Sequence, residues 1–224
     1  MLIWIVVCAV ALVVILYAEA RGKTMPSEAR SPFATRVNAV AKPIASASFV
    51  AAAVMAGAQQ SRGGQALLIA LVWSFLGDIL LIPRSRTAFA FGMAAFAMAH
   101  LGYAFFFDMR GVDWLWVVLG GVAAGAAGAA FFIRLRPSIR KKAPTLLTPV
   151  GAYVAVITVM VAFAIGTVAL SWNPLPLVGA LAFWLSDLTV ALVRFTDAGL
   201  AWRRIGLPLY YAAQFTFIAM LPGA

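Results

Sequence analysis

Eight long runs of apolar residues dominate the chain, and they constrain its fold more than any other feature. About 20 consecutive apolar residues are enough to cross the hydrocarbon core of a bilayer as a helix. An outer-membrane barrel is disfavoured, because its strands alternate apolar and polar residues over about ten positions. The first run counts as a span rather than a signal peptide, since no basic residue precedes it. We predict spans at about 2–18, 38–57, 66–82, 88–107, 114–133, 147–170, 175–195 and 207–222.

The composition agrees with this interpretation. Hydrophobic residues make up 64% of the 224 residues and charged residues only 11%, against about 25% charged in a soluble domain. We therefore predict an all-α membrane protein in the cell membrane, a bundle of eight transmembrane helices that forms a single polytopic domain over residues 1–224. The chain has one cysteine and one histidine, which excludes a zinc site built from these residues. We expect no metal and no cofactor.

Basic residues are distributed unevenly among the links. The net charge of +10 does not indicate nucleic acid here, because Lys and Arg in loops set membrane orientation and contact anionic head groups. Counted with Arg194 near the end of the seventh span, the links after the first, third, fifth and seventh spans hold 14 of the 17 Lys and Arg residues. The links on the opposite side hold only Arg62 and Arg110. The positive-inside rule predicts that both termini lie outside the cytoplasm.

A weak internal repeat relates the two halves of the chain. The segment Phe75–Ile79 in the third span is similar to Trp184–Leu188 in the seventh, and both contain an aspartate. Lys42-Pro43 likewise corresponds to Thr148-Pro149. Each pair has the same orientation, so we expect two parallel four-helix halves, with shared sites at their interface.

Two aspartates, Asp78 and Asp187, are the acids that fall within the spans. A carboxylate at mid-helix costs at least about 2.5–3.5 kcal/mol, so function is its default explanation. We predict that both are catalytic, that their helices are neighbours, and that their carboxyl groups line one cavity in the cytoplasmic half of the bilayer. The other five acids fall in or beside links and are expected to be solvated: Glu19, Glu28, Asp108, Asp113 and Asp197.

Further polar residues of the spans are candidates for binding or positioning a substrate. Helical spacing places Ser74 with Asp78, Arg194 with Asp187, and His100 with Tyr103 on shared faces. The complete set is Lys42, Ser74, His100, Tyr103, Tyr153, Ser186, Arg194, Tyr210, Tyr211 and Gln214. Structural alternatives remain open for several of them. Arg194 could extend to the interface, the serines could bond to their own helices, and Lys42 could simply neutralise an aspartate.

The ordered set of polar motifs resembles a known family. The runs are WSFLGDILLIP (73–83), FAFGMAAFAMAHLGYAFFF (89–107), GALAFWLSDLTVALVRF (179–195) and PLYYAAQFTF (208–217), preceded by Lys42-Pro43. Together they resemble the YhhN family of multi-pass membrane proteins, the lysoplasmalogenases, over the second to eighth spans. The resemblance implies a hydrolase that cleaves the vinyl ether bond of lysoplasmalogens into a fatty aldehyde and glycerophosphocholine or glycerophosphoethanolamine.

The residue chemistry is compatible with that activity. Hydrolysis of a vinyl ether needs a proton donor and a group that activates water, roles that two carboxylates share in glycoside hydrolysis. We expect a lysophospholipid substrate and membrane lipids as partners, with the head group near Lys42 or Arg194. A proton-coupled transporter or a lipid sensor is the alternative, since embedded carboxylates also relay protons. Intramembrane aspartyl proteolysis is disfavoured, because its GxGD and YD patterns are missing around Asp78 and Asp187.

Overall fold

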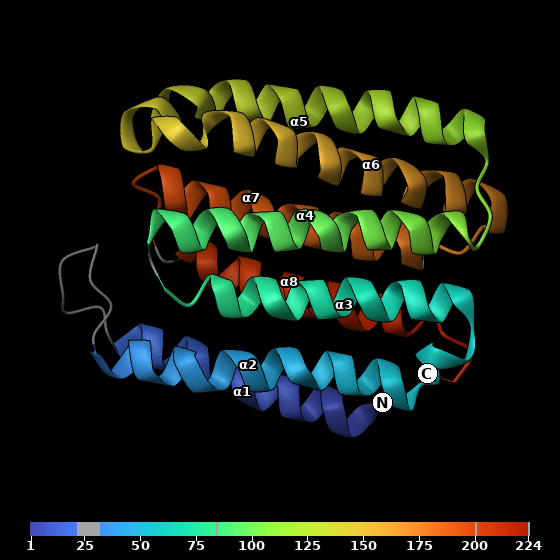
Figure 1. Cartoon of the computed structure of the whole chain (residues 1–224), viewed down its shortest axis with the longest axis horizontal. Coiled ribbons are helices and arrows are strands. Elements are labelled where there is room, and N and C mark those ends of the chain that lie inside the picture. Colours follow the sequence, from blue (N-terminus) through green and yellow to red (C-terminus); the bar gives the residue numbers. More distant parts are fainter. Residues whose placement is uncertain (22–31, 84, 200, 224) are drawn as a thin grey trace.

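The computed structural model describes residues 1–21, 32–83, 85–199 and 201–223, and within these ranges the regular secondary structure is entirely helical. The helices run along one axis and form an elongated bundle (Figure 1). Their bounds are α1 Leu2–Arg21, α2 Pro32–Met55, η2 Ala58–Gln60, α3 Arg62–Leu80, α4 Arg86–Asp108, α5 Trp114–Lys142, η3 Pro144–Leu146, α6 Leu147–Ser171, α7 Leu175–Phe195 and α8 Ala201–Ile218.

The predicted helical membrane bundle is confirmed. In the described ranges, α1 to α7 are each long and apolar enough to cross a membrane, so the protein is a multi-pass membrane protein. The eighth predicted span corresponds to α8, which is not among these seven helices. Its sequence begins Ala-Trp-Arg-Arg and also carries Tyr210, Tyr211 and Gln214, and these residues lower its mean hydropathy below that of the apolar windows in α1 to α7.

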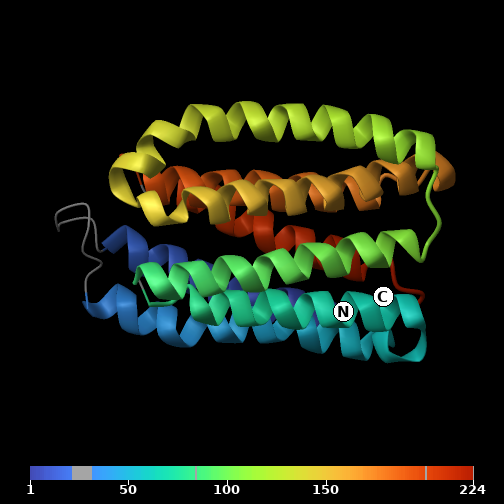
Figure 2. The same ribbon diagram turned by 45° about the horizontal axis from the view of Figure 1, so that its top comes forward.

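Two helices continue past the predicted apolar spans. Residues 134–142 were expected to be a basic link, but α5 continues through Pro137 to Lys142 and lies as one ribbon on the outside of α6 (Figure 2). Lys and Arg are good helix formers, and Leu135 and Ile139 are buried on the inner side of this extension. Helix α2 begins at Pro32, so Lys42 lies ten residues, about 15 Å, into it.

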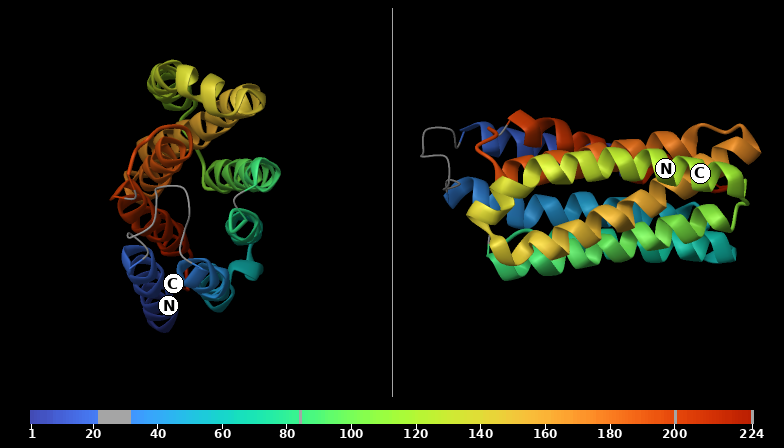
Figure 3. Two further views of the ribbon diagram at one scale, coloured as in Figure 1. Left: turned by 90° about the vertical axis from the view of Figure 1, so that its left-hand side faces the viewer. Right: turned by 90° about the horizontal axis from the view of Figure 1, so that it is seen from above.

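Six helices form a closed ring. Each of α2, α3, α4, α6, α7 and α8 packs against the next, and α8 packs back against α2. Helix α1 lies outside this ring against α2 and α8, and α5 lies outside it against α6 and α7, as the end-on view in Figure 3 shows. The interior is filled by buried aromatic side chains: Phe49, Phe96, Tyr103, Phe183 and Phe217.

The packing repeats between the two halves of the chain. The contacts α1–α2, α2–α3 and α3–α4 have counterparts in α5–α6, α6–α7 and α7–α8, and the halves join through α4–α6 and α2–α8. The expectation that the two aspartate-bearing helices are neighbours was wrong. Helix α3 packs mainly on α2 and α4, and α7 mainly on α6 and α8, so the two helices lie across the ring from each other.

Glycines allow the paired helices that carry the polar residues to approach closely. A Cβ atom on Gly102 of α4 would lie 2.8 Å from the Ala70 Cβ of α3, and one on Gly77 would lie 2.7 Å from the Phe96 ring. In the other half, Cβ atoms on Gly179 and Gly206 would clash with side chains of the partner helix. Small residues at helix contacts serve this purpose in membranes, and here they bring α3 onto α4 and α7 onto α8.

Candidate active site

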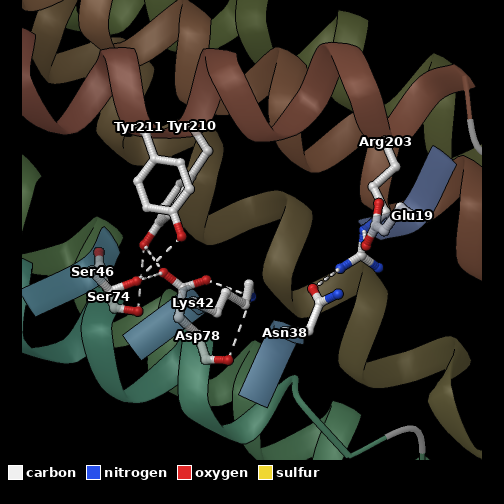
Figure 4. A network of polar contacts seen from close by, with 9 residues as sticks. All are labelled: Glu19, Asn38, Lys42, Ser46, Ser74, Asp78, Arg203, Tyr210 and Tyr211. Carbon is white, nitrogen blue, oxygen red and sulfur yellow. Dashed lines mark hydrogen bonds and ion pairs between the residues drawn. The ribbon is translucent and has the colours of Figure 1, made fainter. Parts of the chain in front are cut away.

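The first polar cluster is centred on the Asp78 carboxylate of α3 (Figure 4). Its Oδ1 atom lies 2.6 Å from Lys42 Nζ, and its Oδ2 atom accepts hydrogen bonds from Ser46 Oγ at 2.6 Å and Tyr210 Oη at 2.8 Å. Tyr211 Oη lies 3.4 Å from Ser46 Oγ. The Asp78 and Lys42 side chains are only 3% and 7% exposed. Both oxygens of this carboxylate are therefore engaged by protein groups.

A chain of hydrogen bonds continues from this cluster towards the middle of the bundle. Tyr210 Oη also approaches the Ser74 carbonyl at 3.4 Å, Ser74 Oγ lies 3.0 Å from Tyr103 Oη, and Tyr103 donates to Gln214 Oε1. The buried Gln214 Nε2 group has no hydrogen-bond partner within the described ranges. An unsatisfied buried donor is costly, so a water or a polar group of a bound molecule would gain a hydrogen bond there.

The second polar cluster is centred on the Asp187 carboxylate of α7. Its Oδ2 atom accepts a hydrogen bond from Tyr153 Oη at 2.8 Å and lies 3.0 Å from His100 Nε2. Tyr153 Oη is also 2.8 Å from His100 Nε2, so the three atoms form a triangle. The other imidazole nitrogen, Nδ1, lies 3.3 Å from the sulfur of Met160. The Asp187 side chain is 16% exposed, several times more than that of Asp78.

The triangle implies that a proton is shared. The phenol of Tyr153 has one proton and donates it to one partner. His100 Nε2 and Asp187 Oδ2 face each other at 3.0 Å, and two bare lone pairs at that distance would repel. One of these two atoms therefore carries a second proton. This cluster thus holds a hydrogen-bonded proton between an imidazole and a partly exposed carboxyl oxygen, two groups that serve as general acids and bases in enzymes.

Aromatic rings separate the two clusters. The Phe183 ring lies 4.5 Å from the His100 ring and 5.2 Å from the Tyr210 ring, measured between centroids. The Phe96 ring contacts both Phe183 and Tyr210 from the side of α4. Asp78 and Asp187 share no hydrogen-bonding partner in the described part of the chain, so the structure places the predicted carboxylates in two centres joined by packing.

The two clusters use equivalent helices of the two halves. Each aspartate lies on the third helix of its half and is bound by the second helix of the same half: Lys42 and Ser46 on α2, and Tyr153 on α6. Each is also bound by the fourth helix of the opposite half, through Tyr210 of α8 for Asp78 and His100 of α4 for Asp187. The internal repeat therefore extends to the polar groups, and each centre is completed across the interface between halves, as parallel repeats predict.

The remaining predicted residues lie at the edges of these clusters. The guanidinium of Arg194 lies over the Phe89 ring at 4.7 Å, on the same helix as Asp187 but two turns beyond it. Ser186 is buried, and its carbonyl accepts a hydrogen bond from Thr189. Among the interactions of the described residues, neither side chain forms a hydrogen bond or ion pair with the Asp187 carboxylate.

Sequence reasoning missed two features of this region. Ser46 lies one turn after Lys42 on α2, and that i, i+4 spacing was the available signal. The expectation that Glu19 is solvated was wrong, because it is 4% exposed and its Oε1 atom lies 2.8 Å from Arg203 Nε. Arg203 also approaches Asn38 Oδ1 at 3.5 Å (Figure 4). This group ties α1 to α2 and α8 beside the Asp78 cluster.

The other acids at the links have structural roles or lie outside the described residues. Asp113 caps α5 by accepting hydrogen bonds from two backbone N–H groups, and Asp108 ends α4. Asp197 is exposed and pairs with Lys142 at 2.8 Å. The hydrogen bond and charge of Lys142 hold the pKa of the Asp197 carboxyl below its usual value. Glu28 lies outside the described ranges.

Metal ligands are not grouped in the structure. No set of three or more His, Cys, Asp or Glu side chains in residues 1–21, 32–83, 85–199 and 201–223 is placed to hold a metal ion. The side chains of the two clusters provide carboxylates, an imidazole, phenols, serine hydroxyls and an ammonium group.

Comparisons with known proteins match the part of the chain that forms the helices carrying these clusters. The YhhN family model matches residues 37–221. A Bos taurus protein named lysoplasmalogenase TMEM86A is 32% identical over 154 residues, which cover 66% of this chain and 61% of that protein. The Homo sapiens protein of the same name is 34% identical over 154 residues, with the same coverage. The match thus spans about three fifths of these curated relatives. No solved structure matches this chain.

Proposed function

The chain belongs to the YhhN family, and from that premise we propose that it is a hydrolase that cleaves the vinyl ether bond of lysoplasmalogens within the membrane. The products would be a fatty aldehyde and glycerophosphocholine or glycerophosphoethanolamine. The printed name of the two relatives supports this substrate class. The observation that carries the proposal is the contact of the partly exposed Asp187 carboxylate with His100 and Tyr153 inside a membrane bundle.

The reaction begins with protonation of carbon. Before the reaction the Asp187–His100 pair holds one proton beyond the N–H of a neutral imidazole. This proton is transferred to the vinyl carbon distant from the ether oxygen, and the carbon attached to oxygen becomes an oxocarbenium ion. The Asp187–His100 pair, now one proton poorer, takes a proton from a water molecule as that water adds to the cation. The resulting hemiacetal then breaks its bond to the glycerol oxygen. The pair gives a proton to this oxygen and takes the hydroxyl proton of the hemiacetal as the aldehyde forms. One water is consumed, and the pair regains its original proton.

Asp78 has a different role in this proposal. Its oxygens are occupied by Lys42, Ser46 and Tyr210, so it is a positioning residue for the reaction. By fixing Tyr210, it fixes the Phe183 ring, which packs on His100.

The membrane location suits an amphiphilic substrate. The alkenyl chain stays in lipid while the head group remains near the basic end of the bundle. We place this end on the cytoplasmic side, because 14 of 17 Lys and Arg residues, Arg194 included, lie in or beside the links there. Both termini then lie outside the cytoplasm, and both are at the same end of the bundle in Figure 1.

Turnover by the purified protein tests the proposal. We expect detergent-solubilised protein to release aldehyde from a lysoplasmalogen but not from the saturated 1-O-alkyl analogue, which has no double bond to protonate. Asp187→Asn removes proton transfer and keeps the side-chain shape, and we expect it to lower kcat by at least about 10²-fold. The matched control is Asp197→Asn, which changes an exposed aspartate and should leave turnover unchanged.

One outcome would reject the hydrolase, and another would reject the role of Asp187 in it. One is the absence of aldehyde from correctly folded protein, as expected for a transporter, which needs a sealed vesicle and a gradient. The other is near wild-type turnover by Asp187→Asn, which would remove this carboxyl from the chemistry.

A further inference from the structure

Arg194 lies on the face of α7 that carries Asp187, towards the basic end of the bundle. Seven residues separate the two, which is two helical turns and about 10 Å along the axis. Asp187 faces the ring interior, where it meets His100 of α4 and Tyr153 of α6. Arg194 reaches towards the same helix α4, where its guanidinium lies over Phe89. A cation is therefore fixed at a defined distance from the acid–base centre.

Ring packing holds this cation in place. The guanidinium carbon is 4.7 Å from the Phe89 centroid, and Phe89 packs edge-on against buried Phe195 at 5.8 Å. Stacking occupies the flat face of a guanidinium, whereas its five N–H donors lie in the plane. One edge can therefore bind two oxygens of a phosphate while the other donors serve protein groups. An arginine held in this way loses less side-chain entropy when it binds an anion.

The spacing matches the dimensions of the substrate class. In a lysoplasmalogen, about seven bonds separate the vinyl carbon that accepts the proton from the phosphorus. An extended covalent chain advances about 1.2 Å per bond, so these atoms are about 8 Å apart. The phosphate oxygens and the long arginine side chain make up the remaining distance to 10 Å. We propose that Arg194 binds the phosphate of the lysophospholipid and sets the distance at which the vinyl ether meets Asp187; this rests on the proposed function.

The other predicted cation for the head group does not fit this role. Lys42 is buried in an ion pair with Asp78 at 2.6 Å, across the ring from Asp187. Using it for a phosphate would break that pair and leave the carboxylate uncompensated. Arg194 is the predicted head-group cation that lies on the helix of the partly exposed carboxylate.

Binding of a lipid that cannot be hydrolysed tests the proposal independently of turnover. The probe is a saturated 1-O-alkyl lysophospholipid, with a 1-O-alkyl glycerol of the same chain length as the phosphate-free comparison. We expect Arg194→Gln to raise the Kd for the phospholipid about 10- to 100-fold, the range for a lost charge-assisted contact. The Kd for the alkyl glycerol should not change. Arg194→Lys should recover part of the affinity, because it keeps the charge but not the fork geometry.

The matched control is Arg140→Gln, which removes an exposed arginine from the basic end of α5. An equal effect of this variant would show that the binding reflects general surface charge, and it would overturn the proposal. An unchanged phospholipid Kd in Arg194→Gln, or an equal loss for the alkyl glycerol, would also overturn it.

Steady-state kinetics separate this proposal from the hydrolase itself. If wild-type protein turns over lysoplasmalogen, Arg194→Gln should raise KM by a similar factor with a much smaller change in kcat. If wild-type protein releases no aldehyde but Arg194→Gln selectively weakens phospholipid binding, the phosphate site stands and the hydrolase fails. A fall in kcat with unchanged KM would assign Arg194 to the chemistry and overturn its role in binding the phosphate.

Discussion

Replacing Lys42 by methionine should lower the stability of the protein far more than the similar size of the two side chains suggests. Lys42 Nζ lies 2.6 Å from Asp78 Oδ1, and the two side chains are 7% and 3% exposed. At an effective dielectric constant of about 20, two unit charges at this distance attract by about 6 kcal/mol before desolvation is counted. Lys42→Met removes one charge and leaves the other buried, and breaking a buried pair in this way costs about 3–5 kcal/mol.

Thermal unfolding in a fixed detergent measures the effect. A loss of about 3–5 kcal/mol corresponds to a fall in Tm of about 6–20 °C for a chain of this size. The double variant Lys42→Met, Asp78→Asn removes both charges and keeps an acceptor for Tyr210, and it should recover most of the lost stability. The matched control is Lys142→Met, which breaks the ion pair with Asp197, whose side chains are 39% and 99% exposed. An exposed pair contributes about 0–1 kcal/mol, so this control should lower Tm by only a few degrees.

Two results would refute the reasoning. If Lys42→Met unfolds at nearly the same temperature as Lys142→Met, the Asp78 carboxylate is not uncompensated when its partner is removed. If the double variant is as unstable as Lys42→Met, the loss comes from packing around the lysine stem and not from the unpaired charge.

Three further predictions follow from the two clusters and the charge distribution. Tyr153→Phe removes a hydroxyl in contact with both His100 and Asp187 and should lower kcat about 10²-fold; full turnover would place this tyrosine outside the reaction. A hydrophobic carbodiimide should modify Asp187 and spare Asp78, because only the former has an appreciably exposed carboxyl; mass spectrometry of the labelled peptides decides, and a label on Asp78 contradicts the assignment. A C-terminal tag should be accessible on intact cells, and one reached only after permeabilisation would reverse the orientation.

The existence of the long helices could be predicted from the apolar runs, because a run of this length has few other stable arrangements in a bilayer. The positions of the helix ends could not be predicted from these runs. Helix α5 continues for nine residues beyond the predicted span through a basic segment, since its stability there comes from backbone hydrogen bonds and the buried side chains of Leu135 and Ile139. Hydropathy indicates which part of a helix lipid could surround. It does not indicate the residue at which the backbone hydrogen bonds of the helix end.

The two aspartates were identifiable because a buried carboxylate in an apolar helix is costly and needs partners. Their separation could not be predicted from spacing along the chain. Helical periodicity states which residues of one helix share a face, but it does not state which helix that face meets. The pairs Asp78–Tyr210 and Asp187–His100 join opposite halves, so they depend on how the halves pack together.

The internal repeat also explains why two similar carboxylates should differ in function. Both centres have the same framework: a second helix of the same half and a fourth helix of the other half. On the second helix, Lys42 and Ser46 face Asp78, whereas Tyr153 faces Asp187. An ammonium group compensates the Asp78 charge permanently. An imidazole and a phenol instead share protons with the carboxylate. The partners therefore make Asp78 a fixed charge that orders the core, and they leave Asp187 as the carboxylate that can exchange a proton with a substrate.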